Sequence, residues 1–214
     1  MRLLKGFLLI VASTLAMQCA FADSLYTFDS VSQTFSNDIP ATLGYVFSVK
    51  SGFEVTSLGW FDDCLNGFVD PHTVELFDTS SGTLLTSLTL SAGTVDPLTG
   101  SFRYHAVTPV TLTPGVTYLL AGTTGNDDAY TENDDVCGFT INPNFIVPAN
   151  AGLFVDNTTT PEFTYPYGHY SDYMTYAGPN LDGVATPEPA SLLLFAAGCA
   201  GLLFLRRRSM WGRL

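Results

Sequence analysis

Two cysteines that each follow a pair of aspartates are the residues best suited to chemistry. One run is Asp62-Asp63-Cys64 and the other is Asp134-Asp135-Val136-Cys137. A disulfide between Cys64 and Cys137 would close a loop of about 74 residues and stabilise the fold by roughly 4 kcal/mol on the chain-entropy model. We predict this disulfide for a chain that matures in an oxidising compartment, with two buried free thiols as the alternative.

Oxygen ligands gather around both cysteines. Ca²⁺ takes six to eight oxygen ligands, and Asp and Asn side chains on flexible loops supply them in extracellular modules. The spacing is not that of an EF-hand, so solvated acidic loops are the competing interpretation. The calcium hypothesis names the following ligands and no other cofactor: Asp62, Asp63, Asn66, Asp70, Asp127, Asp128, Asp134 and Asp135.

Signals of catalysis are weak along the whole chain. His72, His105 and His169 are far apart, and there is no metal-binding histidine pair, G-x-S-x-G turn or phosphate-binding glycine loop. The remaining catalytic alternative is a glycoside hydrolase, in which the fold would place two carboxylates opposite each other. We expect no enzymatic activity and name no catalytic residue.

Aromatic side chains offer a binding hypothesis. Trp60 adjoins the first acidic run, and a second group crowds a stretch near the C-terminus: Phe163, Tyr165, Tyr167, Tyr170, Tyr173 and Tyr176. Exposed aromatic faces stack on sugar rings, whereas buried ones fill the space between two sheets. The core interpretation is favoured, and polysaccharide binding is the alternative.

Short β-branched and aromatic runs, bounded by glycine and proline, must position these residues. Between Pro40 and Gly183, no stretch free of glycine and proline is long enough for an ordinary amphipathic helix. The expected strands are 44–49, 54–61, 73–78, 83–90, 101–107, 110–112, 117–121, 138–141 and 170–176. This spacing predicts an all-β fold, a two-sheet sandwich of the jelly-roll kind.

The charge distribution excludes one class of partner. Residues 23–186 hold 19 acidic and two basic side chains, Lys50 and Arg103, which gives a net charge of −17. Nucleic-acid binding needs a Lys/Arg cluster that releases counterions from phosphate. We therefore expect no nucleic-acid partner.

The N-terminus has the pattern of a secretory signal peptide. Arg2 and Lys5 precede an apolar run over residues 7–16, and Ala20-Phe21-Ala22 supplies a small-residue cleavage site. The apolar run would span only about 15 Å as a helix, so a permanent anchor is the weaker alternative. A lipoprotein cleaved before Cys19 would need a small residue where Gln18 stands. Export through the Sec machinery and cleavage after Ala22 are predicted.

The C-terminus combines three features in a fixed order. Pro187-Glu188-Pro189 is followed by an apolar run over residues 190–205 and then by Arg206-Arg207-Arg208. As a helix the run reaches about 24 Å, slightly less than the 30 Å hydrocarbon core of a bilayer. The three arginines favour a cytoplasmic C-terminus, which leaves the body outside. An ordinary single-pass tail anchor is the alternative.

This order resembles the PEP-CTERM sorting signal of exported Gram-negative bacterial proteins. The resemblance implies recognition of Pro187, Glu188 and Pro189 by an exosortase, a membrane cysteine transpeptidase, during transient inner-membrane insertion. Residues 57–63, 72–78, 81–85, 102–104 and 112–118 also resemble a recurrent body type among such proteins. That second resemblance implies a β-sandwich and no known activity.

Three regions follow from these patterns. They are a signal peptide helix (1–22), a β-sandwich domain (23–183) and a sorting region (184–214) with a motif at 187–189, a transmembrane helix at 190–205 and a basic tail at 206–214. Cys19 and Cys199 lie in segments that processing would remove. We expect a surface or extracellular-matrix protein with a structural or adhesive role. A polysaccharide-binding module is the first alternative and a secreted glycoside hydrolase the second.

Overall fold

The computed structural model describes residues 23–36, 41–125, 127–156, 165, 174–186 and 198. Several predicted functional residues lie outside these ranges: Ala20, Ala22, Pro187, Glu188, Pro189, Arg206, Arg207 and Arg208. The two predicted terminal helices also lie outside them. Within the described part of the chain, no helix is long and apolar enough to cross a membrane.

The first sheet has five antiparallel strands. Their spatial order is β1 (Asp23–Ser24), β17 (Pro179–Ala185), β5 (Phe53–Phe61), β9 (Phe102–Leu112) and β8 (Leu98–Thr99). Pro109 lies inside β9, where the register with β5 shifts between Val55 and Ser57. Proline has no N–H to give to a ladder, and a bulge is a position where a strand tolerates it. One continuous strand therefore replaces the two that the sequence predicts over residues 101–112.

The second sheet has six strands, also antiparallel. Its order is β14 (Phe145–Ile146), β4 (Ala41–Val49), β10 (Thr117–Thr123), β6 (His72–Asp78) and β7 (Thr83–Leu90), and β15 (Gly152–Asp156) pairs with β4 as well. Gly44 faces β10 so closely that an added Cβ would overlap the backbone of Leu120 and Ala121. The close approach of these two strands therefore requires glycine at this position.

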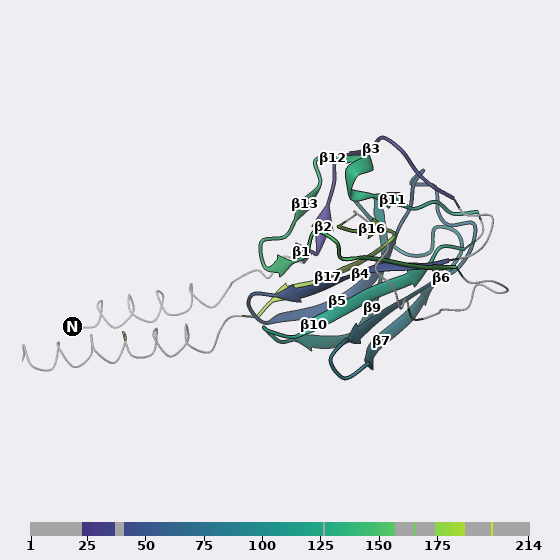
Figure 1. Cartoon of the computed structure of the whole chain (residues 1–214). Helices are drawn as coiled ribbons and strands as arrows, with labels where there is room; N and C mark the ends of the chain where they lie inside the picture. The colour runs from purple at the N-terminus through teal and green to yellow at the C-terminus, as the bar shows by residue number, and fades with distance from the viewer. Residues whose placement is uncertain are drawn as a thin grey trace, which may run out of the picture.

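Three short ladders flank the two sheets. They join β2 (Tyr26–Thr27) to β13 (Thr140–Ile141), β3 (Ser30–Val31) to β12 (Val136–Cys137), and β11 (Thr131–Glu132) to β16 (Tyr176–Ala177). A 3₁₀ turn, η1 (Asn133–Asp135), lies between β11 and β12. These ladders hold segments far apart in sequence against one side of the sandwich (Figure 1).

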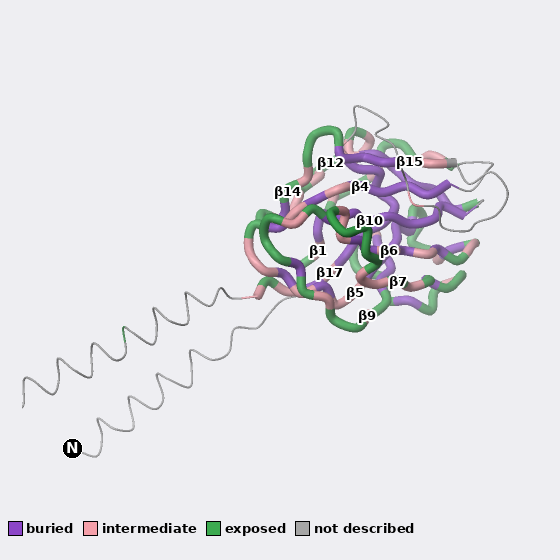
Figure 2. Tube along the Cα trace, turned by 60° about the horizontal axis from the view of Figure 1, so that its bottom comes forward, coloured by how far each residue is buried: buried purple, intermediate pink, exposed green. Residues whose placement is uncertain are grey.

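The core lies between the two sheets. Alternate residues of β4, namely Leu43, Tyr45 and Phe47, belong to one buried cluster with Leu58 and Trp60 of β5. A strand places successive side chains on opposite faces, so this alternation turns one face of each sheet inward. Figure 2 shows the buried strand interiors and the exposed turns that connect them. The prediction of an all-β sandwich is confirmed.

The turns at the two ends of the sandwich differ in charge. We call one end the Lys50 end, which consists of residues 50–52, 79–82, 113–116 and 142–144; these segments contain no Asp or Glu. We call the other the acidic end, which consists of residues 62–71, 91–97, 124–125 and 127–130. The acidic end contains six carboxylates: Asp62, Asp63, Asp70, Asp96, Asp127 and Asp128.

Both ends of the described body lie in neighbouring strands. Asp23 of β1 is opposite Gly183 of β17, and Ala185 is opposite Phe53 at the start of β5. The backbone N–H of Thr186 donates to the carbonyl oxygen of Gly52 at 2.8 Å. The body therefore begins beside β17 and finishes at the Lys50 end (Figure 1).

Candidate functional site

Arg103 organises the acidic end from within. Its Nε donates to Asp62 Oδ2 at 2.7 Å, and both side chains are almost fully buried. Its other nitrogens donate to the carbonyl oxygens of Asp96 at 2.9 Å and Leu65 at 3.4 Å. One guanidinium group thus joins the loops that follow β5 and β7, because its five donors form a rigid fork.

A second buried carboxylate closes the same end. Asp128 accepts hydrogen bonds from the backbone N–H groups of Val69 and Asp70, the shortest at 2.7 Å, and it lies 3.1 Å from Nε2 of His72. Burial alone would raise the pKa of Asp128, but the hydrogen bonds from His72, Asp70 and Val69 hold it below its ordinary value. This carboxylate is therefore ionised and fully engaged at neutral pH.

His72 has a polar partner at each ring nitrogen. Nδ1 lies 2.7 Å from the carbonyl oxygen of Thr123, which can only accept, and Nε2 faces the ionised Asp128, which also only accepts. Both ring nitrogens are therefore engaged by polar partners within the fold, and the ring is fully buried. It stacks on Trp60 with a centroid separation of 4.7 Å and meets the ring of Phe68 edge-on. A buried ring with both nitrogens engaged leaves no free position for a substrate proton.

The structure divides the predicted calcium ligands. Asp70 and Asp127 meet, because the backbone N–H of Asp127 donates to Asp70 Oδ2 at 3.2 Å. Asp62 and Asp128 bind Arg103 and His72 instead, whereas Asp63 and Asn66 are exposed. Asp134 and Asp135 lie apart from these in η1. Among the described residues, no group of three or more His, Cys, Asp or Glu side chains is placed to hold a metal ion.

In place of the predicted disulfide, Cys64 and Cys137 are free, exposed thiols. Cys64 lies in the turn after β5, while Cys137 lies on β12, where its backbone pairs with Ser30. The charge of Asp63, and the hydrogen bond that its carboxylate accepts from the thiol, raise the pKa of Cys64. Asp63, which suggested a functional role for Cys64, therefore keeps this thiol protonated and less reactive.

Sequence reasoning missed three members of this end: Arg103, Asp96 and His105. Asp96 Oδ1 lies 2.6 Å from Nδ1 of His105, and its Oδ2 accepts from the backbone N–H of Ser91 at 3.2 Å. The available signal was the rarity of basic residues, because an arginine in a body of −17 charge has many carboxylates to choose from. What the sequence does not give is which carboxylates the fold places beside it.

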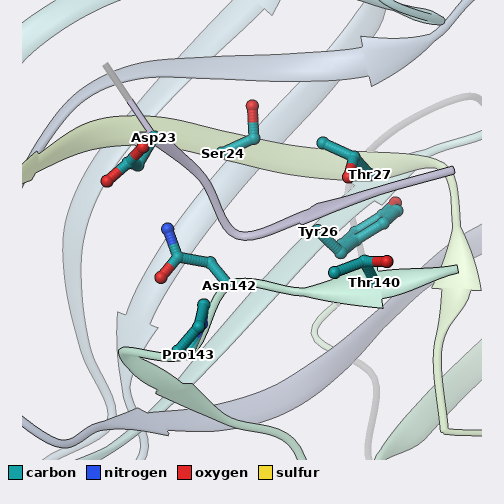
Figure 3. Close-up of a pocket in the computed structure, with 7 residues that line it drawn as sticks. All are labelled: Asp23, Ser24, Tyr26, Thr27, Thr140, Asn142 and Pro143. Atoms are coloured by element: carbon teal, nitrogen blue, oxygen red, sulfur yellow. The ribbon is translucent and has the colours of Figure 1, made fainter. Parts of the chain in front are cut away.

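A small pocket opens beside the first strands of the body. Its volume is about 280 Å³, and its lining comes from the β1–β2 segment and from β13 with the residues after it (Figure 3): Asp23, Ser24, Tyr26, Thr27, Thr140, Asn142 and Pro143. The lining offers hydroxyl, amide and carboxylate groups. It includes one acidic residue, Asp23, whereas hydrolysis of a glycosidic bond uses two.

The aromatic residues divide between two apolar clusters. Trp60 is fully buried and Tyr176 nearly so, and both belong to the core between the sheets. Tyr165 packs on Phe77 on the opposite face of the second sheet, at a centroid separation of 5.0 Å. The core interpretation holds for Trp60 and Tyr176. Phe163, Tyr167, Tyr170 and Tyr173 lie outside the described residues.

The C-terminal region carries the functional assignment. Residues 185–208 match the family model of the PEP-CTERM protein-sorting motif. A comparison with curated proteins gave no significant match. The matched segment begins at Ala185, the last residue of β17, so the motif follows the sandwich without a linker. The chain therefore carries a PEP-CTERM sorting signal, the signal of exported proteins that an exosortase processes.

Proposed function

We propose that this protein is a non-catalytic component of the cell surface or extracellular matrix, which an exosortase delivers there as a folded β-sandwich. Signal-peptide cleavage after Ala22 and cleavage near Pro187 would leave a body that starts at Asp23. Its role would be structural or adhesive, and its final location would be outside the inner membrane.

One observation carries the proposal: the fold is complete just before the Pro187-Glu188-Pro189 segment of the sorting motif. β17 lies between β1 and β5, and it pairs with β5 from Pro179 to Ala185. The last described backbone contact of this segment joins Thr186 to Gly52. A cut beyond Thr186 would therefore remove no strand from either sheet, and the released body would keep its core.

The engaged charges support a role without catalysis. The buried carboxylates of Asp62 and Asp128 already contact Arg103 and His72, and neither lines the pocket. The pKa of Asp182 is raised by burial and further by the nearby Asp23, but Asp182 does not line the pocket. A general acid needs such a shift and also a place beside the substrate.

Polysaccharide binding is the second candidate, because the pocket presents the groups that bind sugar hydroxyls. Asn142 and Thr140 supply an amide and a hydroxyl at its rim, and Asp23 supplies a carboxylate (Figure 3). A pocket of about 280 Å³ is at the lower limit of small-ligand sites, which suits one sugar unit more than a chain.

The experiment applies the processed protein to the host's own surface polysaccharide. The proposal expects neither retention on the polysaccharide nor release of reducing sugar, together with loss of surface cohesion or adhesion in a strain that lacks the protein. Retention that is lost in Asn142→Ala, but kept in Asn66→Ala at the acidic end, would establish the binding module instead. Reducing-sugar release would establish a hydrolase.

A further inference from the structure

The end turns that contain carboxylates lie at one end of the sandwich. The chain leaves the fold at the other end. The turns of the Lys50 end consist of Thr, Ser, Gly, Asn, Pro, Val and one Lys, whereas the acidic end holds six Asp. Asp78, at the base of the 79–82 turn, lies at the surface, where its carboxylate accepts hydrogen bonds from the N–H groups of Ser80 and Ser81. Asp23, Glu54 and Asp182 lie on the strands behind these turns.

The two basic residues of the body are divided in the same way. Arg103 is buried at the acidic end by its pairing with Asp62. Lys50 is exposed, and its Nζ donates to the carbonyl oxygen of Pro143 at 2.6 Å, which holds the ammonium group against the 142–144 segment. Of the two basic residues in the described body, Lys50 is therefore the exposed one, and it lies at the end where the chain leaves the fold.

The length of chain after the fold sets how far this end can stand from the membrane. Thr186 is held to Gly52 by a backbone hydrogen bond. Three residues, 187–189, separate Thr186 from the apolar run that starts at Ala190. Fully extended, four residue steps cover about 14 Å. The headgroup layer of a bilayer is about 6 Å deep on each side, so the Lys50 end must lie at or close to it.

We propose that the Lys50 end is a membrane-facing surface that rests on phospholipid headgroups while the protein is anchored. This inference rests on the proposed function, because it needs residues 190–205 to be inserted. Turns without carboxylates lessen repulsion by anionic headgroups, and one lysine near such a surface contributes about 1 kcal/mol. Strands of nine residues place the acidic end about 30 Å away, more than three Debye lengths at physiological ionic strength.

The test uses the unprocessed chain, purified from a strain without exosortase and reconstituted in phosphatidylethanolamine/phosphatidylglycerol vesicles that contain headgroup-spin-labelled lipid. One variant carries a single fluorescent label at Ser81→Cys, with the native cysteines replaced. Its matched control keeps Cys64, at the acidic end, as the labelled residue. Flotation of the vesicles reports anchoring, and nitroxide quenching reports which end faces the lipid.

We expect the chain to float and the label at position 81 to be quenched severalfold more strongly than the label at Cys64. A chain that floats with equal quenching at both positions, or with stronger quenching at Cys64, overturns this inference and leaves the proposed function intact. Quenching at position 81 that requires added exosortase would also overturn it, because the surface would then face the enzyme. A chain that does not float contradicts both proposals.

A charge-matched pair of variants isolates the role of Lys50. Lys50→Gln and Asn66→Asp each change the net charge by −1, at opposite ends of the sandwich. One lysine's contribution corresponds to a change of about fivefold in the ratio of headgroup-facing to other orientations. We expect Lys50→Gln to lower quenching at position 81 on anionic vesicles and Asn66→Asp to leave it unchanged. Equal effects of the two variants would contradict a specific contact by this lysine.

Discussion

At the scale of single residues, Arg103 is the side chain on which the acidic end depends most. It is buried against Asp62 and also holds the carbonyl oxygens of Asp96 and Leu65. Arg103→Met leaves Asp62 as a buried carboxylate without its cation, and we expect a loss of about 3–5 kcal/mol in the free energy of unfolding. Urea denaturation measures this loss, with Lys50→Met as the matched control at an exposed cation. Equal losses of unfolding free energy in the two variants would show that the buried Arg103–Asp62 pair stabilises the fold no more than an exposed lysine does.

Asp128 gives the fold a defined pH dependence. Although burial opposes it, the hydrogen bonds from His72, Asp70 and Val69 leave the pKa of this carboxyl lower in the folded than in the unfolded state. Its contribution to stability is therefore complete above the unfolded pKa, about 3.9, and is lost as the pH falls through the folded pKa. We expect the difference in unfolding free energy between wild type and Asp128→Asn to shrink below about pH 4. Denaturation of both proteins from pH 7 to pH 3 measures it, and a constant difference would contradict the assignment.

At the scale of secondary-structure elements, β17 determines where the body may be cut. Because β17 lies between β1 and β5, its removal would leave β5 with an unpaired edge and expose Leu58 and Trp60 of the core. We expect a chain of residues 23–186 to unfold in one cooperative thermal transition and a chain of residues 23–178 to show none. Calorimetry of both fragments tests this, and cooperative unfolding of the shorter one would place the boundary of the fold before β17.

The same element shows what the sequence could not predict about the fold. Its residues, Pro-Asn-Leu-Asp-Gly-Val-Ala, have the composition of a turn, and the predicted strands did not include it. Pro179 is tolerated as the first residue of the strand. Gly183 is required where the strand approaches β5, because an added Cβ would overlap the carbonyl oxygen of Glu54. Strands with plain alternation, such as β6 and β7, were predicted within one residue of their observed bounds.

At the scale of the whole molecule, sequence proximity was a poor guide to the candidate site. The pattern pointed to a cluster of carboxylates around two cysteines, but the fold pairs Asp62 with an arginine 41 positions away and Asp128 with a histidine 56 positions away. These partners are long-range, so no local signal reveals them. The sorting signal was predicted well because its three parts are contiguous in the sequence.

Removal of calcium tests the remaining metal hypothesis on the whole body. Asp62 and Asp128, two of its proposed ligands, are already engaged by Arg103 and His72 of the protein itself. We therefore expect the thermal melting curves in EDTA and in millimolar CaCl₂ to coincide. A higher melting temperature in CaCl₂, reversed by EDTA and lost in Asp70→Asn, would establish a calcium site between the loops that contain Asp70 and Asp127.

The central claim is that the terminal segments are removed and the folded acidic body is what reaches the surface. Intact mass of the protein recovered from cells and medium tests it most directly, in a host with its exosortase and in one without. The account predicts a species that starts at Asp23 and ends near Pro187 in the first host, and one that extends to Leu214 in the second. A chain that still ends at Leu214 in the presence of active exosortase would contradict the account.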